Sequence, residues 1–302
     1  MDLLQEKTLE NKIRGCLFGL AIADAAVYGP AAGTPAGGLS PQADLVLLVG
    51  ETLSQAPLGA ALPPLLSKAF LAWSEKGRQG GQAFDAALAH LKQGGKWQES
   101  GSQALDPGAA LRATTVGLLE NGATLDHMQE TVIQSTQLIQ TDTLALAGGL
   151  AQAFASAYLA RVEELDALHF MESLITTVES VSAAFADDLR SLVGYLGMDC
   201  AWVIQVVEPS QGVMESFETA LFCFLKSPEE FEVTLQNALQ AKATAPLVAL
   251  LAASLSGAYL GYDRLPGILL GRALEKARVD SAAAAILQKS LKNTGLFSAS
   301  SH

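Results

Sequence analysis

Residues 242–266, KATAPLVALLAASLSGAYLGYDRLP, predict a helix that other helices must surround. From Ala243 to Tyr262 the stretch carries no charged side chain, and Ala, Ser and Gly fall on every side of the helix. A helix that is apolar all round is buried on all sides, and small side chains let neighbouring backbones approach closely. Pro246 suits the first turn, whose unpaired N–H groups face whatever lies at that end. We therefore expect a central helix in a helical core.

The composition of the whole chain agrees with packed helices. Half of the 302 residues are hydrophobic but only 6 % are aromatic, so Ala and Leu make up much of the apolar content. Alternating β-branched residues are scarce, which is typical of helices rather than of a β-sandwich or barrel. A chain of this length can bury a large core. We predict one all-α domain over residues 1–302, with an ordered core at 10–292.

Charge and cysteine usage exclude several classes of function. The net charge of −12 argues against a nucleic-acid or anionic membrane partner. Cys16, Cys200 and Cys223 show no metal-binding spacing, so we expect core thiols in a reducing compartment. The N-terminus lacks a signal-peptide pattern, which favours a cytoplasmic location. Residues 143–160 and 243–262 are long apolar runs, but they lack flanking basic clusters and aromatic belts, so we expect soluble core helices.

Apolar periodicity divides the rest of the chain into helices and loops. Helices are expected over residues 10–27, 44–54, 57–73, 84–91, 108–119, 124–139, 143–161, 163–181, 183–195, 211–225, 228–239 and 266–292. Residues 202–207 form the only strand-like run, and their structure stays undecided. The Gly- and Pro-rich run YGPAAGTPAGGLSPQ, residues 28–42, lacks the Lys and Ser/Thr of a phosphate-binding loop, so we expect a plain loop. The tail from Asn293 is expected to fray.

Three stretches carry a family pattern. They are KIRGCLFGLAIADA at residues 12–25, DPGAALRATTVGLL at 106–119, and ETALFCFLKSPEEFEVTLQNALQAKATAPLVALLAASLSGAYLG at 218–261. The first resembles an opening helix that reads RxxGxLxGLAxGDA, and the second resembles GNGAAMRxxPxGLL. The third resembles two helices joined by an SP-containing turn and followed by GGDTDTxxAIxGALxGAYxG. In this order they resemble the ADP-ribosylglycohydrolase family, which includes the dinitrogenase reductase-activating glycohydrolases.

The resemblance implies a fold and a chemistry. Members of the family are orthogonal multi-helix bundles that hold two divalent cations, usually Mg or Mn, at the centre. They cleave the glycosidic bond between ADP-ribose and a protein side chain, or related ADP-ribosyl bonds. Such hard cations need oxygen ligands, and the metals can orient ribose hydroxyls and activate a water. In the family these ligands come from a TDDT motif before the second helix and from the GGDTDT motif.

This sequence departs from the family at both metal-binding motifs. Residues 51–53 match the family's ESL, which places TDDT on residues 40–43. Residues 257–259 match its GAY, which places GGDTDT on residues 242–247. The four metal-ligating Asp positions are therefore held by Pro41, Gln42, Thr244 and Pro246. Pro side chains coordinate nothing and Gln and Thr bring no charge, so two divalent cations there would repel each other. We expect a degenerate member without a metal cofactor.

Six residues remain as candidate ligand contacts in a vestigial cleft, and each also has a structural interpretation. The candidates are Asp24, Ser40, Asp44, Asp106, Arg112 and Thr244. Asp24 matches an Asp of the family's first helix, but a buried carboxylate must also find a hydrogen-bonding partner. Asp44 is a helix-start charge that could also serve a single weak cation site. Asp106 and Arg112 could pair with each other, and the two hydroxyl residues could cap helices. The family's ribose-side Asn is Pro107 here.

Three functions are compatible with this pattern. The first is a non-catalytic binding or structural protein, with an ADP-ribose-like nucleotide or another protein as its partner. The second is an active hydrolase of ADP-ribosyl bonds that uses a shifted site around Asp24, Asp44 and Asp106. This needs two of these carboxylates within a few ångströms of one cavity. The third is an oligomeric scaffold, which an exposed apolar patch on an outer helix would favour. A closed cleft would be filled by leucines, namely Leu105, Leu111 and Leu247.

Overall fold

A computed structural model describes residues 3–29, 38–208 and 212–299 of the chain. Within these ranges the regular structure is helical, with no strand, so the expected all-α fold is confirmed. One isolated backbone bridge joins Ser102 to Gln140. The α-helices are α1 (Leu3–Tyr28), α2 (Pro41–Gln55), α3 (Leu62–Ser74), α4 (Gln82–Lys92), α5 (Gly108–Leu119), α6 (Leu125–Thr136), α7 (Thr143–Leu159), α8 (Ala167–Glu179), α9 (Ala183–Val193), α10 (Cys200–Val207), α11 (Val213–Lys226), α12 (Phe231–Leu239), α13 (Leu247–Leu260), α14 (Gly267–Arg272) and α15 (Lys276–Ala299). Two short 3-10 helices are η2 (Trp97–Glu99) and η3 (Tyr262–Arg264).

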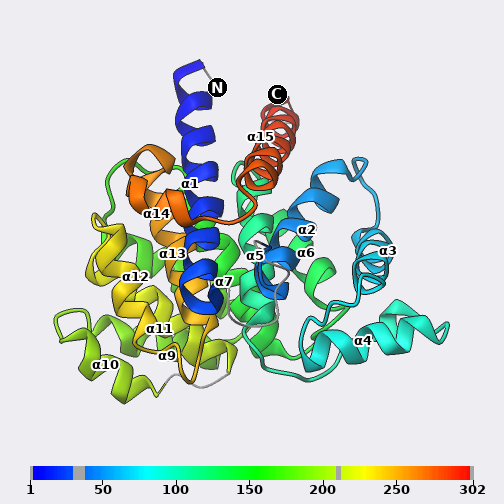
Figure 1. Ribbon diagram of the computed structural model, residues 1–302, viewed down its shortest axis with the longest axis horizontal. Helices are drawn as coiled ribbons and strands as arrows, with labels where there is room; N and C mark the ends of the chain where they lie inside the picture. The colour runs from blue at the N-terminus through cyan, green and yellow to red at the C-terminus, as the bar shows by residue number, and fades with distance from the viewer. Residues whose placement is uncertain (1–2, 30–37, 209–211, 300–302) are drawn as a thin grey trace.

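The central helix of the sequence prediction is α13, and every residue of it is buried. It packs against α1, α7, α11 and α12 (Figure 1). The contact with α1 is between backbones: a Cβ placed on Gly15 would lie 2.3 Å from the carbonyl oxygen of Gly257. A Cβ on Gly19, one turn further along α1, would lie 2.3 Å from the carbonyl oxygen of Ala253. Small residues on both helices therefore set the distance between them.

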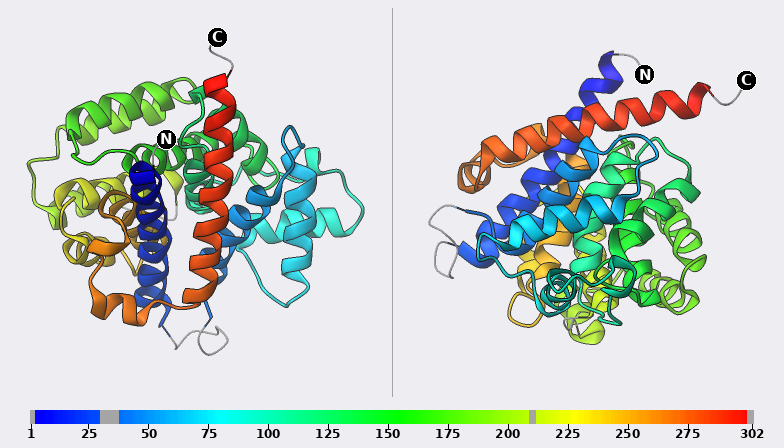
Figure 2. Two further views of the ribbon diagram at one scale, coloured as in Figure 1. Left: turned by 90° about the horizontal axis from the view of Figure 1, so that it is seen from above. Right: turned by 90° about the vertical axis from the view of Figure 1, so that its right-hand side faces the viewer.

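A second set of helices packs beside this pair. Helix α5 is buried from end to end and lies against α2 and α7. Its Gly117 makes another backbone contact, because a Cβ there would lie 2.0 Å from the carbonyl oxygen of Ala153 on α7. Helix α15 crosses α1 and α2, and its last turns project from the body at the same end as the first turns of α1 (Figure 2). Helices α3 and α4 form the right-hand edge of the view in Figure 1.

The structure settles one segment that the sequence left undecided and corrects one expected helix start. Residues 202–207 belong to helix α10, whose start is capped by Asp199 accepting a hydrogen bond from the backbone N–H of Trp202 at 3.2 Å. Helix α12 begins at Phe231 rather than at residue 228, with Glu230 before its first turn, so Ser227 does not cap it. The Ser227 carbonyl instead accepts hydrogen bonds from the N–H of Glu230 at 3.1 Å and from the Thr234 hydroxyl at 3.0 Å.

The ends of other helices also move. Helix α1 starts at Leu3 instead of residue 10, α3 starts at Leu62 instead of 57, and α8 starts at Ala167 instead of 163. The helix expected over 266–292 is interrupted between α14 and α15, where Glu275 has a positive φ of 47°. Helix α15 continues to Ala299 through the tail that was expected to fray. Most of the loop expected at 28–42 lies outside the described residues.

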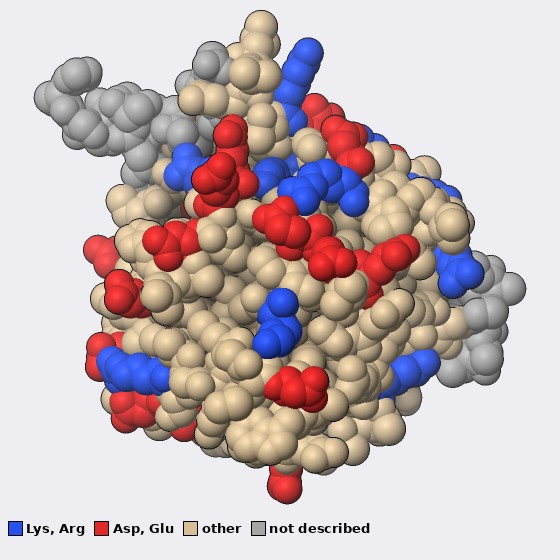
Figure 3. Space-filling view, turned by 90° about the vertical axis from the view of Figure 1, so that its left-hand side faces the viewer, with Lys and Arg blue, Asp and Glu red and all other residues tan. Residues whose placement is uncertain are grey.

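The surface and the apolar helices bear on possible partners. Among the described residues, no helix has both the length and the apolar character to span a bilayer; α7 and α13 have 17 and 14 residues. On the face shown in Figure 3, basic side chains are dispersed among acidic ones rather than gathered into one basic patch. This face offers no continuous basic track for a nucleic-acid backbone.

Glu218 on α11 is a buried carboxyl group whose Oε1 has no hydrogen-bond partner. Burial raises the pKa of Glu218 to about 8, and the carboxylates of Asp188 and Glu215 add to the rise. The folded state therefore holds a proton that the unfolded state releases near its ordinary pKa of 4.5. The resulting stabilisation is complete below that value and is lost as the pH rises toward 8.

We expect Glu218→Gln to remove this pH dependence. The thermal midpoint of the wild type should fall between about pH 5 and pH 8, and the variant should be flatter and more stable at about pH 8.5, by up to about 5 kcal/mol. Glu172→Gln, at an exposed position of α8, is the control for losing one negative charge. An unchanged slope in the Glu218 variant would contradict this role for the carboxyl group.

Candidate functional site

A pocket of about 640 Å³ lies where the N-terminal ends of α2, α5 and α13 converge. Its wall includes Gln42 of α2, Pro107 before α5, and residues 245–247 at the start of α13. Residues 80–83 at the start of α4 form another side. Gln42 and Pro246 stand at metal-ligand positions of the resembling family, and Pro107 stands at the ribose-side Asn. The pocket therefore occupies the place where the family's site was expected.

The three leucines that could have filled the cleft, Leu105, Leu111 and Leu247, do not close this pocket. Leu105 and Leu247 are part of its wall, whereas Leu111 is buried and is not among the lining residues. The polar part of the lining comes from five side chains, Tyr28, Gln42, Gln82, Ser102 and Asp106. Asp106 is the single carboxylate among the described lining residues. The pocket is thus mixed in character, with hydroxyl and amide groups around one negative charge.

Asp24 and Ser40 form a buried pair that fixes the start of α2. The Asp24 carboxylate accepts hydrogen bonds from the Ser40 backbone N–H at 2.8 Å and from the Ser40 hydroxyl. The Ser40 oxygen in turn caps α2 by accepting from the N–H of Ala43 at 3.3 Å. Burial raises the pKa of Asp24, and the hydrogen bonds from Ser40 oppose that rise. Neither residue lines the pocket, and both hold α1 to α2.

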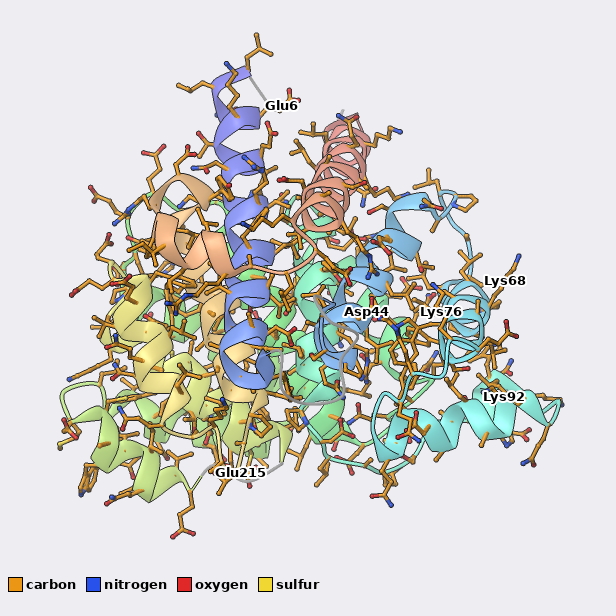
Figure 4. The ribbon with its side chains drawn as sticks, viewed as in Figure 1. Glu6, Asp44, Lys68, Lys76, Lys92 and Glu215 are labelled. Atoms are coloured by element: carbon orange, nitrogen blue, oxygen red, sulfur yellow. The ribbon has the colours of Figure 1, made fainter. Side chains whose placement is uncertain are left out.

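Asp44 lies on α2 within the helical body (Figure 4). Its buried carboxylate is surrounded by donors. It forms ion pairs with Arg78, which precedes α4, and with Arg278 of α15. The indole N–H of Trp73 on α3 donates to the Oδ2 atom of Asp44 at 2.5 Å. Arg278 also pairs with Glu51 of α2 at 2.9 Å. Two guanidinium groups and an indole N–H therefore bind the Asp44 carboxylate. Asp44 is the carboxylate nearest in sequence to residues 40–43, where the family has TDDT.

Asp106 and Arg112 lie at the start of α5 without forming the ion pair considered from the sequence. Asp106 accepts a hydrogen bond from the N–H of Gly108 at 3.0 Å, which caps the helix. Arg112 is buried and donates to the Gln140 side-chain oxygen at 2.8 Å. Burial lowers the pKa of Arg112, and the Asp106 carboxylate opposes this effect. Gln140 also donates to the carbonyls of Ala104 and Asp106, so it holds the chain along the pocket wall.

Thr244 lies just before residues 245–247, which form the α13 side of the pocket wall. Thr244 is exposed, donates to the Ala241 carbonyl at 3.3 Å and is not a lining residue. Lys242 donates to the carbonyl of Ala26 at 3.0 Å, which ties the approach of α13 to the end of α1. Gln42 donates to the carbonyl of Gly80 at 2.8 Å, so its amide holds the loop before α4. These contacts position the pocket walls.

Comparisons with known proteins agree with the shape and the sequence pattern. A family model described as ADP-ribosylglycohydrolase matches residues 5–295. The chain belongs to the ADP-ribosylglycohydrolase family. An uncharacterized protein of Archaeoglobus fulgidus is 21 % identical over 274 residues, which cover 83 % of this chain and 88 % of that protein. A solved structure described as an ADP-ribosylglycohydrolase-related protein complex matches with a TM-score of 0.70 and 19 % identity, covering 94 % of this chain and 99 % of that one. The latter match shows the fold.

The donor set in this member of the ADP-ribosylglycohydrolase family does not fit a pair of divalent cations. Two of the four aligned ligand positions are prolines, Pro41 and Pro246, which have no donor atom. Gln42 is engaged with Gly80, and Thr244 lies outside the pocket lining. In the part of the chain that the structure describes, no three His, Cys, Asp or Glu side chains are grouped closely enough to hold a metal ion. We therefore derive no chemical step through metal ions in this ADP-ribosylglycohydrolase relative.

Sequence reasoning missed two residues that shape the site. Tyr28, at the end of α1, lines the pocket, and burial raises the pKa of its hydroxyl to about 12, so it is a neutral donor at physiological pH. Gln140 organises the opposite wall through three hydrogen bonds. Tyr28 lies three residues beyond the first of the three family stretches, and Gln140 lies between the second and the third. Neither belongs to a quoted motif, so the sequence pattern did not single them out.

Proposed function

We propose that this member of the ADP-ribosylglycohydrolase family binds an ADP-ribosyl nucleotide in its cleft and does not hydrolyse it by a two-metal mechanism. One observation carries the proposal: the cleft is open, while the nearest carboxylate to the replaced TDDT motif, Asp44, is held by Arg78 and Arg278. A carboxylate already paired with two guanidinium groups is a poor cation ligand, because a metal ion would have to displace them.

The cleft has features that suit such a ligand. A volume of about 640 Å³ falls in the range of small-molecule sites. Asp106 is placed to accept hydrogen bonds from ribose hydroxyls, and the Tyr28 hydroxyl and Gln82 amide supply further donors. Leu105 and Leu247 give apolar surface against which a nucleobase can pack. The ligand is thus held by hydrogen bonds and apolar contact, without a metal bridge.

The alternative of a hydrolase with a shifted site lacks its second carboxylate. Of the three residues considered for it, Asp24 is bonded to Ser40 and Asp44 to the arginines. Asp106 is the one of the three that lines the pocket. Hydrolysis by paired carboxylates requires both on one cavity with a water between them.

Calorimetric titration with ADP-ribose tests the proposal when a cleft-filling variant is compared with its neighbour. Ala86 and Ala89 are both exposed on α4, but Ala86 lines the cleft and Ala89 lines a different depression. We expect EDTA-treated wild type and Ala89→Trp to bind alike, and Ala86→Trp to lose at least about tenfold in affinity, or about 1.4 kcal/mol. Equal binding by both Trp variants would place the ligand elsewhere. Release of free ADP-ribose from an ADP-ribosylated substrate in the presence of Mg or Mn would contradict the absence of two-metal hydrolysis.

A further inference from the structure

Two of the three cysteines lie side by side in the folded chain. Cys200 is the first residue of α10, Cys223 lies in the last turn of α11, and their sulfur atoms are 3.8 Å apart. Both are free thiols, and both are buried. We propose that Cys200 and Cys223 form a redox-active dithiol, which a hydroperoxide oxidises to an intramolecular disulfide joining α10 to α11. This inference does not depend on the proposed ligand of the cleft.

The positions of the two sulfurs permit this bond with little movement. A disulfide bond is about 2.05 Å long, so the sulfurs must approach by roughly 1.8 Å. Cys200 stands at the start of an eight-residue helix that packs against α11. The outer face of α10 is exposed at Trp202 and Val206, so this short helix lies at the surface. In the proposal, the approach of the two sulfurs comes from rotation of the Cys200 side chain together with a shift of α10.

The two thiols are chemically unequal. Cys200 is slightly exposed at the start of a surface helix, whereas Cys223 is fully enclosed within α11. The hydrogen bond with Cys223 lowers the pKa of Cys200, although burial and the Asp199 carboxylate oppose this, and the same hydrogen bond and burial raise the pKa of Cys223. Because a peroxide reaches Cys200 first, Cys200 is the nucleophile, and Cys223 is the thiol that resolves the first product.

The reaction balances in two steps. The Cys200 thiolate attacks one peroxide oxygen, the O–O bond breaks, and Cys200 becomes a sulfenic acid while the second oxygen leaves as hydroxide or alkoxide and takes up a proton. The Cys223 sulfur then attacks the Cys200 sulfur, the S–O bond breaks, and the hydroxyl leaves with the Cys223 proton as water. Two thiols are oxidised, and one peroxide is reduced.

The third cysteine supplies an internal control. Cys16 is fully buried on α1, where a core helix packs against α13, and desolvation raises its pKa. Cys16 is a free thiol and takes no part in the contact between Cys200 and Cys223. A peroxide should therefore oxidise Cys200 at least about tenfold faster than Cys16.

Peptide mapping of the full chain after treatment with hydrogen peroxide tests the proposal. We expect the number of free thiols to fall from three to one. The map should show one peptide pair linked through Cys200 and Cys223 of the same chain, with no disulfide between chains. Cys223→Ser should stop at a sulfenic acid that dimedone traps on Cys200, whereas Cys16→Ser should behave like the wild type. Three free thiols in the wild type after treatment, or a linkage between two chains, would overturn the proposal. The wild-type map decides this even if a variant fails to fold.

Discussion

Asp44→Asn is expected to lower the free energy of unfolding by about 3–5 kcal/mol, the range found when one partner of a buried ion pair is removed. The Asp44 carboxylate is 1 % exposed, and it pairs with Arg78 and Arg278. Asparagine keeps the shape but not the charge, so Arg78 loses its carboxylate partner and Arg278 keeps only its pairs with Glu51 and Glu275. The network links α2, α15 and the segment before α4, so all three contacts weaken together. Equilibrium denaturation in urea measures the loss.

Asp187→Asn is the matched control for this prediction. Asp187 also pairs with an arginine, Arg190, at 2.5 Å, but its side chain is 70 % exposed. Exposed pairs contribute about 0–1 kcal/mol because water screens them. If Asp44→Asn costs no more than Asp187→Asn, the buried network is not what holds these helices.

Gly257→Ala is expected to lower the free energy of unfolding by about 3 kcal/mol, at the upper end of the cost of overpacking a core. A Cβ at Gly257 would lie 2.1 Å from the carbonyl oxygen of Gly15, which is backbone and cannot rotate away. Helices α1 and α13 must separate to accept the methyl group, and this opens a backbone contact at the centre of the core. Thermal or urea unfolding of the purified variant measures the effect.

Gly271→Ala is the control for a glycine-to-alanine change in a helix. Gly271 lies on α14, and a Cβ there would meet no atom within 4 Å. Alanine has the higher helix propensity, so this variant should be unchanged or more stable by up to about 1 kcal/mol. Similar losses of unfolding free energy in the two variants would show that the close approach of α1 and α13 does not restrict position 257 to glycine.

Much of the helical core could be predicted from the sequence. The uncharged run around α13 required burial on all sides, and the structure buries every residue from Leu247 to Leu260. The bounds of α5 agree with the sequence prediction at both ends. Helix α10 was not recognised, because CAWVIQVV is rich in β-branched residues and reads like a strand. Its cap at Asp199 and its packing on α11 override that preference.

The candidate site was predictable in its location but not in its contacts. The family motifs placed the helix ends that line the pocket. They did not indicate that Asp44 meets Arg278, which lies 234 residues away, or that Arg112 meets Gln140. Such pairs depend on helix packing over long separations in sequence, and a single sequence carries no local signal for them. The same holds for Cys200 and Cys223, whose proximity follows from the packing of α10 on α11.

The most direct test of the central claim is thermal unfolding of the EDTA-treated protein with Mg, with Mn, with ADP-ribose, and with each metal and ADP-ribose together. A ligand at a hundred times its Kd stabilises the folded state by about 2.7 kcal/mol, which gives a measurable rise in Tm. We predict a rise with ADP-ribose alone, no rise with either metal alone, and no further rise when the metal is added to the nucleotide. A rise that requires Mg or Mn and grows with ADP-ribose would contradict the loss of the metal site, and no rise under any condition would contradict nucleotide binding.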